Sequence, residues 1–168
     1  PYPKFPARSS YYGIVDLAGF PKDVYYMYQS EWTKKNVLHL FPHWNAAANG
    51  ATGWNKGDTV DVWAYYNNAD EVELFHNGKS VGKRSKTYTI LHVMWRVPFE
   101  VGTLKAISFK NGEQVLVKEI KTAGTPNKIE LVTNNKKISA AKNELAFITA
   151  RIKDKNGNLV TGSDRQLT

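Results

Sequence analysis

The stretch Val72–Gly82 restricts the fold of this chain more than any other part of the sequence. Apolar and polar residues alternate up to Asn77-Gly78, and the alternation then starts again. A period of two predicts a half-buried strand, and Asn-Gly between two such runs predicts a hairpin, because both residues tolerate positive φ. The stretch therefore predicts an antiparallel β fold and carries no chemistry of its own.

Further short strands are expected on both sides of this hairpin. Apolar periodicity places them at residues 37–41, 59–66, 92–99, 103–110 and 113–121, with a second hairpin turn at Asn111-Gly112. With the first hairpin this makes about seven strands in roughly 90 residues, which is the rhythm of an immunoglobulin-like β-sandwich. The predicted fold class is therefore mainly β.

Residues 22–32 form the one segment with a clear helical pattern. Pro21 precedes it, which suits the first turn of a helix, where the N–H that proline lacks is not needed. Tyr25, Tyr28 and Trp32 share one face of this helix. We expect that face to pack either on the β module or on a domain outside this chain.

Residues 123–126, Ala-Gly-Thr-Pro, read as a linker. Strands at 128–133 and 145–153 and a turn at Asn156-Gly157 follow. About 40 residues are too few to close a sandwich of their own. We therefore expect an incomplete β unit with an unpaired edge, through which two copies of the chain could form an edge-paired homodimer.

Composition excludes several classes of function. The chain has no cysteine, so it has no disulfide, thiolate zinc site or thiol nucleophile. Its 23 basic and 15 acidic residues give a net charge of +8, but the positive charge is spread along the sequence. The densest run, residues 83–86, is interpreted as a solvated strand end rather than a phosphate site, so no nucleic-acid partner is expected. No apolar run is long enough to cross a membrane, and the first residue, Pro1, indicates a piece of a longer protein.

No motif predicts a catalytic residue, a cofactor or a metal. The sequence has no Gly-rich phosphate loop, nucleophile elbow or metalloprotease helix. His39 and His43 are four residues apart, but Pro42 lies between them and the segment reads as a strand, so both are expected to be structural. Glycosidases need two carboxyl groups facing each other across the sugar, and nothing in the sequence marks such a pair.

Aromatic residues are the remaining candidates for a functional surface. Alternation places Trp63, Tyr65 and Phe75 on the face opposite the core. Such a strip could stack on sugar rings, or a helix or neighbouring domain could cover it. The candidates for sugar binding or domain docking are Trp44, Trp54, Trp63 and Tyr65.

Several long stretches resemble family two of the glycoside hydrolases, in particular β-galactosidase-like enzymes of Bacteroidetes. Residues 6–23 and 28–32 resemble the end of the catalytic barrel of those enzymes. The stretches that resemble the immunoglobulin-like domain after the barrel are residues 38–45, 70–80 and 95–106. Residues 145–160 resemble the start of a second domain of the same kind.

The resemblance implies a domain organisation and a parent activity. It implies a barrel remnant at residues 1–35, which includes the helix at 22–32, an immunoglobulin-like sandwich at 36–123, and a partial second one at 124–168. The parent would hydrolyse terminal β-galactosides or related glycosides. Its catalytic glutamates would precede Pro1, which leaves this chain an inactive accessory region.

The resemblance also implies partners and a compartment. The expected partners are the catalytic barrel and the neighbouring domains of the parent chain, and the expected compartment is periplasmic or extracellular. The alternative function is a carbohydrate-binding sandwich that uses exposed aromatic residues.

Overall fold

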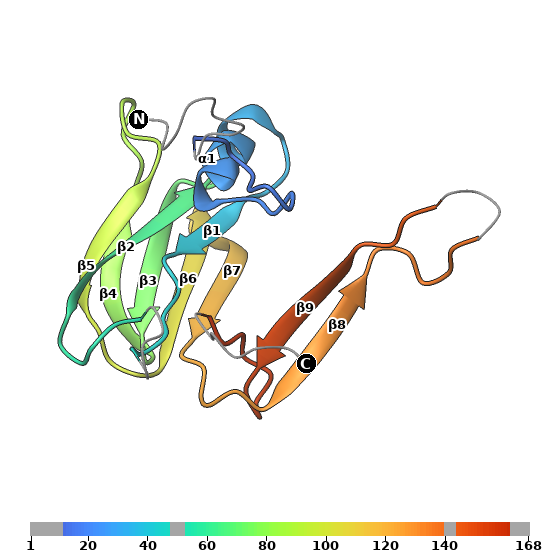
Figure 1. The fold of residues 1–168 in the computed structure, drawn as a ribbon. Coiled ribbons are helices and arrows are strands. Elements are labelled where there is room, and N and C mark those ends of the chain that lie inside the picture. The colour runs from blue at the N-terminus through green and yellow to red at the C-terminus, as the bar shows by residue number, and fades with distance from the viewer. Residues whose placement is uncertain (1–11, 48–52, 140–143, 162–168) are drawn as a thin grey trace, which may run out of the picture. The chain divides into compact units, whose positions relative to one another are not determined.

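The computed structural model describes residues 12–47, 53–139 and 144–161. Among these residues it contains one helix and nine strands (Figure 1). They are α1 (Asp23–Trp32), β1 (Leu38–Phe41), β2 (Thr59–Tyr66), β3 (Glu71–His76), β4 (Lys79–Arg84), β5 (Val93–Pro98), β6 (Thr103–Lys110), β7 (Glu113–Lys121), β8 (Lys128–Thr133) and β9 (Ile148–Lys153). Within the described ranges, no helix is long and apolar enough to cross a membrane.

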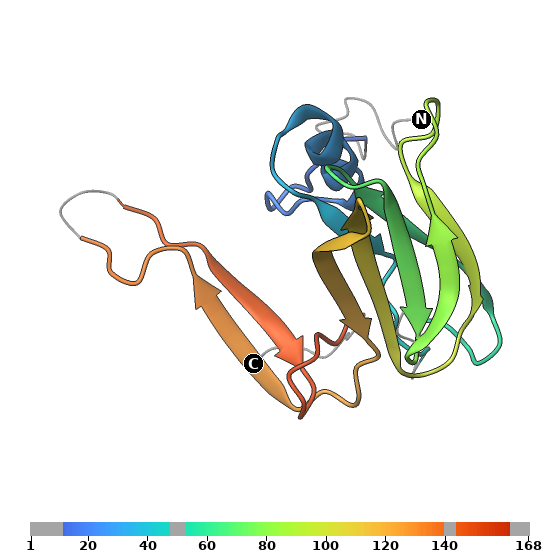
Figure 2. The same cartoon turned by 180° about the vertical axis from the view of Figure 1, so that it is seen from behind.

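Seven of the described strands form two sheets, with the orders β1-β2-β5 and β4-β3-β6-β7. Figures 1 and 2 show the two sheets from opposite sides. The pairs β1–β2, β3–β4 and β3–β6 are antiparallel. The mainly β, immunoglobulin-like fold predicted from the sequence is thereby confirmed.

The core follows the predicted alternation of inward and outward residues. In β2, the side chains of Val60, Val62, Ala64 and Tyr66 are each at most 1% exposed. The inward residues of the other strands are buried in the same way, namely Val72, Leu74, Val93, Trp95, Val97, Leu104 and Ala106. Period-two alternation therefore identified the buried faces of β2 and β5.

Both Asn-Gly turns have the backbone conformation that the sequence predicts. Asn77 and Gly78 have φ values of 50° and 81°, and Asn111 and Gly112 have 51° and 81°. Two successive residues with positive φ turn the chain with the same twist as the flanking strands. The opening hairpin thus pairs His76 with Lys79.

Phe75 does not share a face with Trp63 and Tyr65, so this part of the prediction was wrong. Phe75 lies on β3, in the four-stranded sheet, whereas Trp63 and Tyr65 lie on β2, in the three-stranded sheet. Alternation separates inward from outward positions but does not say to which sheet a strand belongs.

The chain forms two compact units. The first comprises Pro1–Pro42, Asp61–Val97 and Leu104–Glu119, and the second comprises His43–Val60, Pro98–Thr103 and Ile120–Thr168. The second unit contains the ribbon of β8 and β9, which pair antiparallel from Lys128↔Lys153 to Thr133↔Ile148. After β9 the chain reverses at the predicted Asn156-Gly157 turn, where Gly157 has a φ of 86°.

Candidate functional site

The first candidate site is the joint between α1 and β1, in the first unit. The Tyr26 ring stacks on the His39 ring, with centroids 3.8 Å apart and planes 10° from parallel. On the same ring, His39 Nε2 lies 2.8 Å from Asp23 Oδ1, so the first turn of the helix is bound to the strand. Ser30, one turn after Tyr26, is buried and donates its hydroxyl hydrogen to the carbonyl oxygen of Met27.

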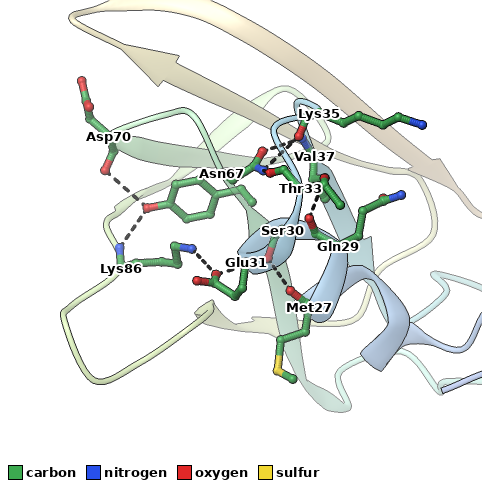
Figure 3. Close-up of polar contacts among 11 residues, drawn as sticks. Met27, Gln29, Ser30, Glu31, Thr33, Lys35, Val37, Asn67, Asp70 and Lys86 are labelled. Carbon is green, nitrogen blue, oxygen red and sulfur yellow. Dashed lines mark hydrogen bonds and ion pairs between the residues drawn. The ribbon is translucent and has the colours of Figure 1, made fainter. Parts of the chain in front are cut away.

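Asn67 fixes the chain that leads from α1 into β1 (Figure 3). Its Nδ2 donates to the carbonyl oxygens of Thr33 and Lys35, at 3.1 and 2.9 Å. Its Oδ1 accepts from the backbone N–H of Val37 at 2.8 Å. One carboxamide thus satisfies three backbone groups of a segment about 30 residues earlier in the chain.

Lys86 ties the segment after β4 to the same joint (Figure 3). Its Nζ lies 2.6 Å from Glu31 Oε1 and 5.2 Å from the centre of the Tyr66 ring. Its backbone N–H donates to the Tyr66 hydroxyl, which donates to the carbonyl oxygen of Asp70. Burial raises the pKa of Tyr66, which favours the protonated hydroxyl that donates here.

The basic run at residues 83–86 therefore has partners within the first unit. Lys83 pairs with Glu71 and lies over the Phe109 ring, and Lys86 pairs with Glu31. Two of the cations in this run are accordingly engaged by carboxylates of the chain itself.

The predicted aromatic face of the helix is only partly exposed, since Trp32 is exposed whereas Tyr25 and Tyr28 are half-buried. Successive residues of an α-helix turn by about 100°, so Tyr28 points about 200° away from Tyr26. Trp32 is 76% exposed, and its ring lies 4.6 Å from that of Tyr28. We call Tyr25, Tyr28 and Trp32 the outer aromatic face of α1. The sequence identified this face but not the direction in which it points, because an apolar stripe does not reveal which part of the protein covers it.

Apolar residues before the helix are also exposed. Tyr12, Leu17 and Phe20 are 80%, 88% and 49% exposed. Asp16 holds the turn between them, because its Oδ1 accepts from the backbone N–H groups of Ala18 and Phe20. Exposed apolar residues concentrated in one segment are typical of an interface.

Two of the predicted site residues, Trp63 and Tyr65, belong to a ladder of aromatic rings on β1 and β2. The Phe41 ring lies 4.9 Å from that of Tyr65 and 6.2 Å from that of Trp63, and Trp63 stacks on His92 at 4.1 Å. Burial, with a smaller contribution from the charge of Asp23, raises the pKa of Tyr65. Burial lowers the pKa of His92, which favours the neutral imidazole. The Trp63 ring is thus already stacked within the chain.

The other two predicted residues, Trp44 and Trp54, lie in the second unit. Trp44 is fully buried, packs against Phe99 at 4.9 Å and donates its Nε1–H to the carbonyl oxygen of Glu100 at 2.8 Å. Trp54 is half-buried and donates its Nε1–H to the carbonyl oxygen of His43 at 3.1 Å. Trp63 and Tyr65 therefore share the Phe41 ring as a neighbour in the first unit, whereas Trp44 and Trp54 have other partners in the second.

Asn45 makes long-range contacts in the second unit. The side chain is 7% exposed, and its Oδ1 accepts from the backbone N–H of Ala123 at 2.8 Å. Its Nδ2 donates to Thr161 Oγ1 at 2.6 Å. Asn45 thus connects the predicted linker with the chain that follows the ribbon.

Asp154 organises the turn after β9. It is 1% exposed, and its carboxylate accepts from the backbone N–H groups of Gly124, Asn156 and Asn158, at 2.8 to 2.9 Å. These hydrogen bonds, led by that from Gly124, lower the pKa of Asp154 to about 2. The carboxylate is therefore saturated by donors of the chain.

The structure places the two histidines considered as metal ligands in structural roles. His39 contacts Asp23 and Tyr26, and the Nδ1 atom of His43 accepts from the backbone N–H of Asn45 at 3.3 Å. Within the described ranges, no group of three or more metal-ligating side chains comes together.

Asn67, Asn45 and Asp154 are important residues that the sequence did not single out. The only signal for Asp154 is the local pattern Asp-Lys-Asn-Gly-Asn, which is typical of a turn closed by an aspartate side chain. Asn67 and Asn45 carry no local signal, because their partners lie 30 or more residues away.

Comparison with known proteins gives relatives along nearly the whole chain. A family model described as "Domain of unknown function (DUF4982)" matches residues 57–116. "Beta-galactosidase BoGH2A" of Bacteroides ovatus is 55% identical over 160 residues, which cover 95% of this chain and 18% of that protein. A "Putative beta-glucuronidase" of Formosa agariphila is 46% identical over 121 residues, which cover 70% of this chain and 11% of that protein.

A solved structure is similar over most of the chain. It is that of a glycosyl hydrolase family 2 member from Bacteroides cellulosilyticus DSM 14838, with a TM-score of 0.76 and 30% identity, and the match covers 88% of this chain and 22% of that one. The chain therefore spans about a fifth or less of the length of each relative named here.

Proposed function

We propose that this chain, which belongs to family two of the glycoside hydrolases and corresponds to part of such an enzyme, is a non-catalytic accessory region that braces the catalytic barrel. The parent enzyme would hydrolyse terminal β-galactosides or related glycosides. The names of the relatives, a β-galactosidase and a putative β-glucuronidase, support a glycoside hydrolase parent.

The observation that carries the proposal is the orientation of α1. One face of the helix is bound to the sandwich through Tyr26 and its stack on His39, while Trp32 on the outer aromatic face is 76% exposed. An exposed tryptophan on the helix and an exposed apolar segment before it are typical of a surface that another domain covers. In our proposal the barrel of the parent chain packs on that face.

The domain organisation in this proposal is the one that the family resemblance implies. Residues 1–35 end the barrel, residues 36–123 form the immunoglobulin-like sandwich, and residues 124–168 begin a second one. The apolar face of the β8–β9 ribbon supports the last assignment, since Leu131 is 69% and Ile148 67% exposed. Further strands of the parent chain would cover that face.

The aromatic residues are assigned to packing and docking rather than to sugar binding. Trp44 has no exposed surface, and Tyr65 retains only 9% of its own. The Trp63 ring already stacks on His92, so that ring face is not available to a sugar. Trp54 and Trp63 would contact neighbouring domains of the parent.

A titration of tryptophan fluorescence with galactosides separates docking from sugar binding at these residues. We expect no saturable change in the emission up to millimolar sugar. A saturable change that the Trp54→Ala or Trp63→Ala variant abolishes would support a carbohydrate-binding module instead.

The role of the outer aromatic face is tested in the full-length parent enzyme. The double change Tyr28→Ala with Trp32→Ala should lower its free energy of unfolding by about 2–4 kcal/mol, because two aromatic rings would lose buried contacts. The kcat of the folded enzyme should stay unchanged. Lys34→Ala, an exposed neighbour, is the matched control. Equal stability of the double variant and the control would refute bracing through this face.

The proposed inactivity of the chain is tested by assaying it alone with a chromogenic β-galactoside. We expect no turnover above that of buffer. Turnover that copurifies with the chain would refute the assignment of the catalytic glutamates to the rest of the parent.

A further inference from the structure

A cavity of about 310 Å³ lies in the first unit where α1, β1 and β7 meet. Helix α1 contributes Tyr26 and Gln29, and β1 with the residues before it contributes Asn36 and His39. Strand β7 contributes Val117 and Lys118. A cavity of this size is at the lower end of the range found for small-molecule sites.

The cavity lies between the outer strands of the two sheets. β1 ends the order β1-β2-β5, and β7 ends the order β4-β3-β6-β7. Each of these strands therefore has, within the described residues, one backbone edge that pairs with no neighbouring strand. Backbone N–H and C=O groups on such an edge are available to a ligand as donors and acceptors.

Three polar side chains of the lining are available as well. In the part of the chain that the structure describes, the Gln29 carboxamide and the Lys118 ammonium group have no hydrogen-bond partner. The Oδ1 of Asn36 accepts from Asn68 Nδ2 at 2.9 Å, which leaves its own Nδ2 as a donor. The three groups together provide both donors and acceptors.

The remaining walls define the chemical class of the ligand. Val37, Leu38, Leu116 and Val117 supply apolar surface, and no carboxylate is among the described lining residues. The lining carries the Lys118 ammonium group without a compensating carboxylate, so it disfavours a cation. It suits an uncharged molecule of one ring that has an apolar face and a rim of hydroxyl groups, since a hydroxyl both donates and accepts.

We propose that this cavity binds a single neutral pyranose, at a site separate from the aromatic residues Trp44, Trp54, Trp63 and Tyr65. Gln29, Asn36 and Lys118 hydrogen-bond the sugar hydroxyls, and the C–H face of the ring lies against the aliphatic wall. The small number of polar contacts predicts weak binding, with a Kd on the order of 1 mM.

The test is a titration of the whole chain, followed through its backbone amide resonances, with methyl β-galactoside and methyl β-glucoside. We expect saturable shifts at Val37, Leu38 and Val117 with at least one sugar, and none at Trp54 or Trp63. Cyclohexanemethanol, which is similar in size but nearly lacks hydroxyl groups, should cause no saturable shift. Shifts centred on Trp54 or Trp63, or equal binding of the alcohol, would overturn the proposal.

Two variants test the cavity itself. Gln29→Ala with Lys118→Ala should weaken binding roughly tenfold, since two hydrogen bonds to the ligand are lost. Lys110 is an exposed cation at the end of β6, and the Lys110→Ala variant should bind the sugar as tightly as the unchanged chain does. Val117→Trp should abolish binding by filling the cavity, while the amide spectrum shows that the fold is kept. Unchanged binding in a folded Val117→Trp variant, or no saturable shift with either sugar up to about 50 mM, would refute the site.

Discussion

The Tyr26 ring stacks on the His39 ring with the centroids 3.8 Å apart, although neither residue belongs to the aromatic face that the sequence predicts for the helix. The stack gives α1 two distinct sides. One side is bound to β1 by Tyr26 and Asp23, which both contact His39, and the other presents Trp32 to the outside. A short helix with these two sides can join a sandwich to a further domain.

Asn67→Ala should destabilise the first unit. The change removes three hydrogen bonds to the backbone of Thr33, Lys35 and Val37, and we expect a loss of about 1–3 kcal/mol in the free energy of unfolding. Urea unfolding measures it. Asn127→Ala, an exposed asparagine of the second unit, should stay within about 0.5 kcal/mol of the unchanged chain. Equal effects of the two changes would show that the Asn67 contacts contribute nothing specific.

The turn around Asp154 should loosen in acid. The pKa of Asp154 is lowered from 3.8 to about 2 in the folded chain, so its contribution to stability is complete above pH 3.8 and is lost as the pH falls through about 2. The amide resonances of Gly124, Asn156 and Asn158 report this loss directly.

Asp154→Asn provides the comparison for the acid titration. It replaces an acceptor-only carboxylate by a carboxamide, so we expect weaker protection of the Gly124 amide at neutral pH and a flatter response to acid. A Gly124 amide that titrates identically in both proteins would rule out Asp154 as the group responsible.

The β8–β9 ribbon should drive weak association of the chain. Ile129, Leu131 and Ile148 are 53%, 69% and 67% exposed, and the pairing register puts them on one face of the ribbon. Leu131→Lys with Ile148→Lys should reduce any association seen by light scattering, while Val132→Lys on the opposite face should not. A chain that remains monomeric at every concentration would exclude both the apolar contact and an edge-paired homodimer.

Local sequence signals predicted most of the fold. Asn77-Gly78 and Asn111-Gly112 defined two hairpins because their positive φ values are a local property of those residues. The bounds of α1 differ from the predicted ones by only one residue, but Pro21 lies before the N-cap Lys22 and pairs with Val15, so its expected place in the first helical turn was wrong. Such features depend only on residues that are close in the sequence, so they can be predicted from it.

The candidate site was less predictable because its contacts are distant in the sequence. Asn67 lies in a polar turn, and nothing nearby reveals that its carboxamide binds residues about 30 positions earlier. Trp44 was a candidate for a surface role, but its burial follows from packing against Phe99, 55 positions later, which periodicity does not report. The orientation of α1 was not predictable either, because the sequence does not say which face of the helix packs on β1.

One side of α1 packs on the sandwich and, in our central claim, the other side packs on the barrel. Its most direct test is the free energy of unfolding of Tyr26→Ala and Trp32→Ala, each measured in this chain alone and in the full-length parent. In the chain alone, Tyr26→Ala should cost about 1–2 kcal/mol and Trp32→Ala less than about 0.5 kcal/mol. In the parent, both should be destabilising. A Trp32→Ala variant that is as stable as the unchanged protein in both settings would contradict the account.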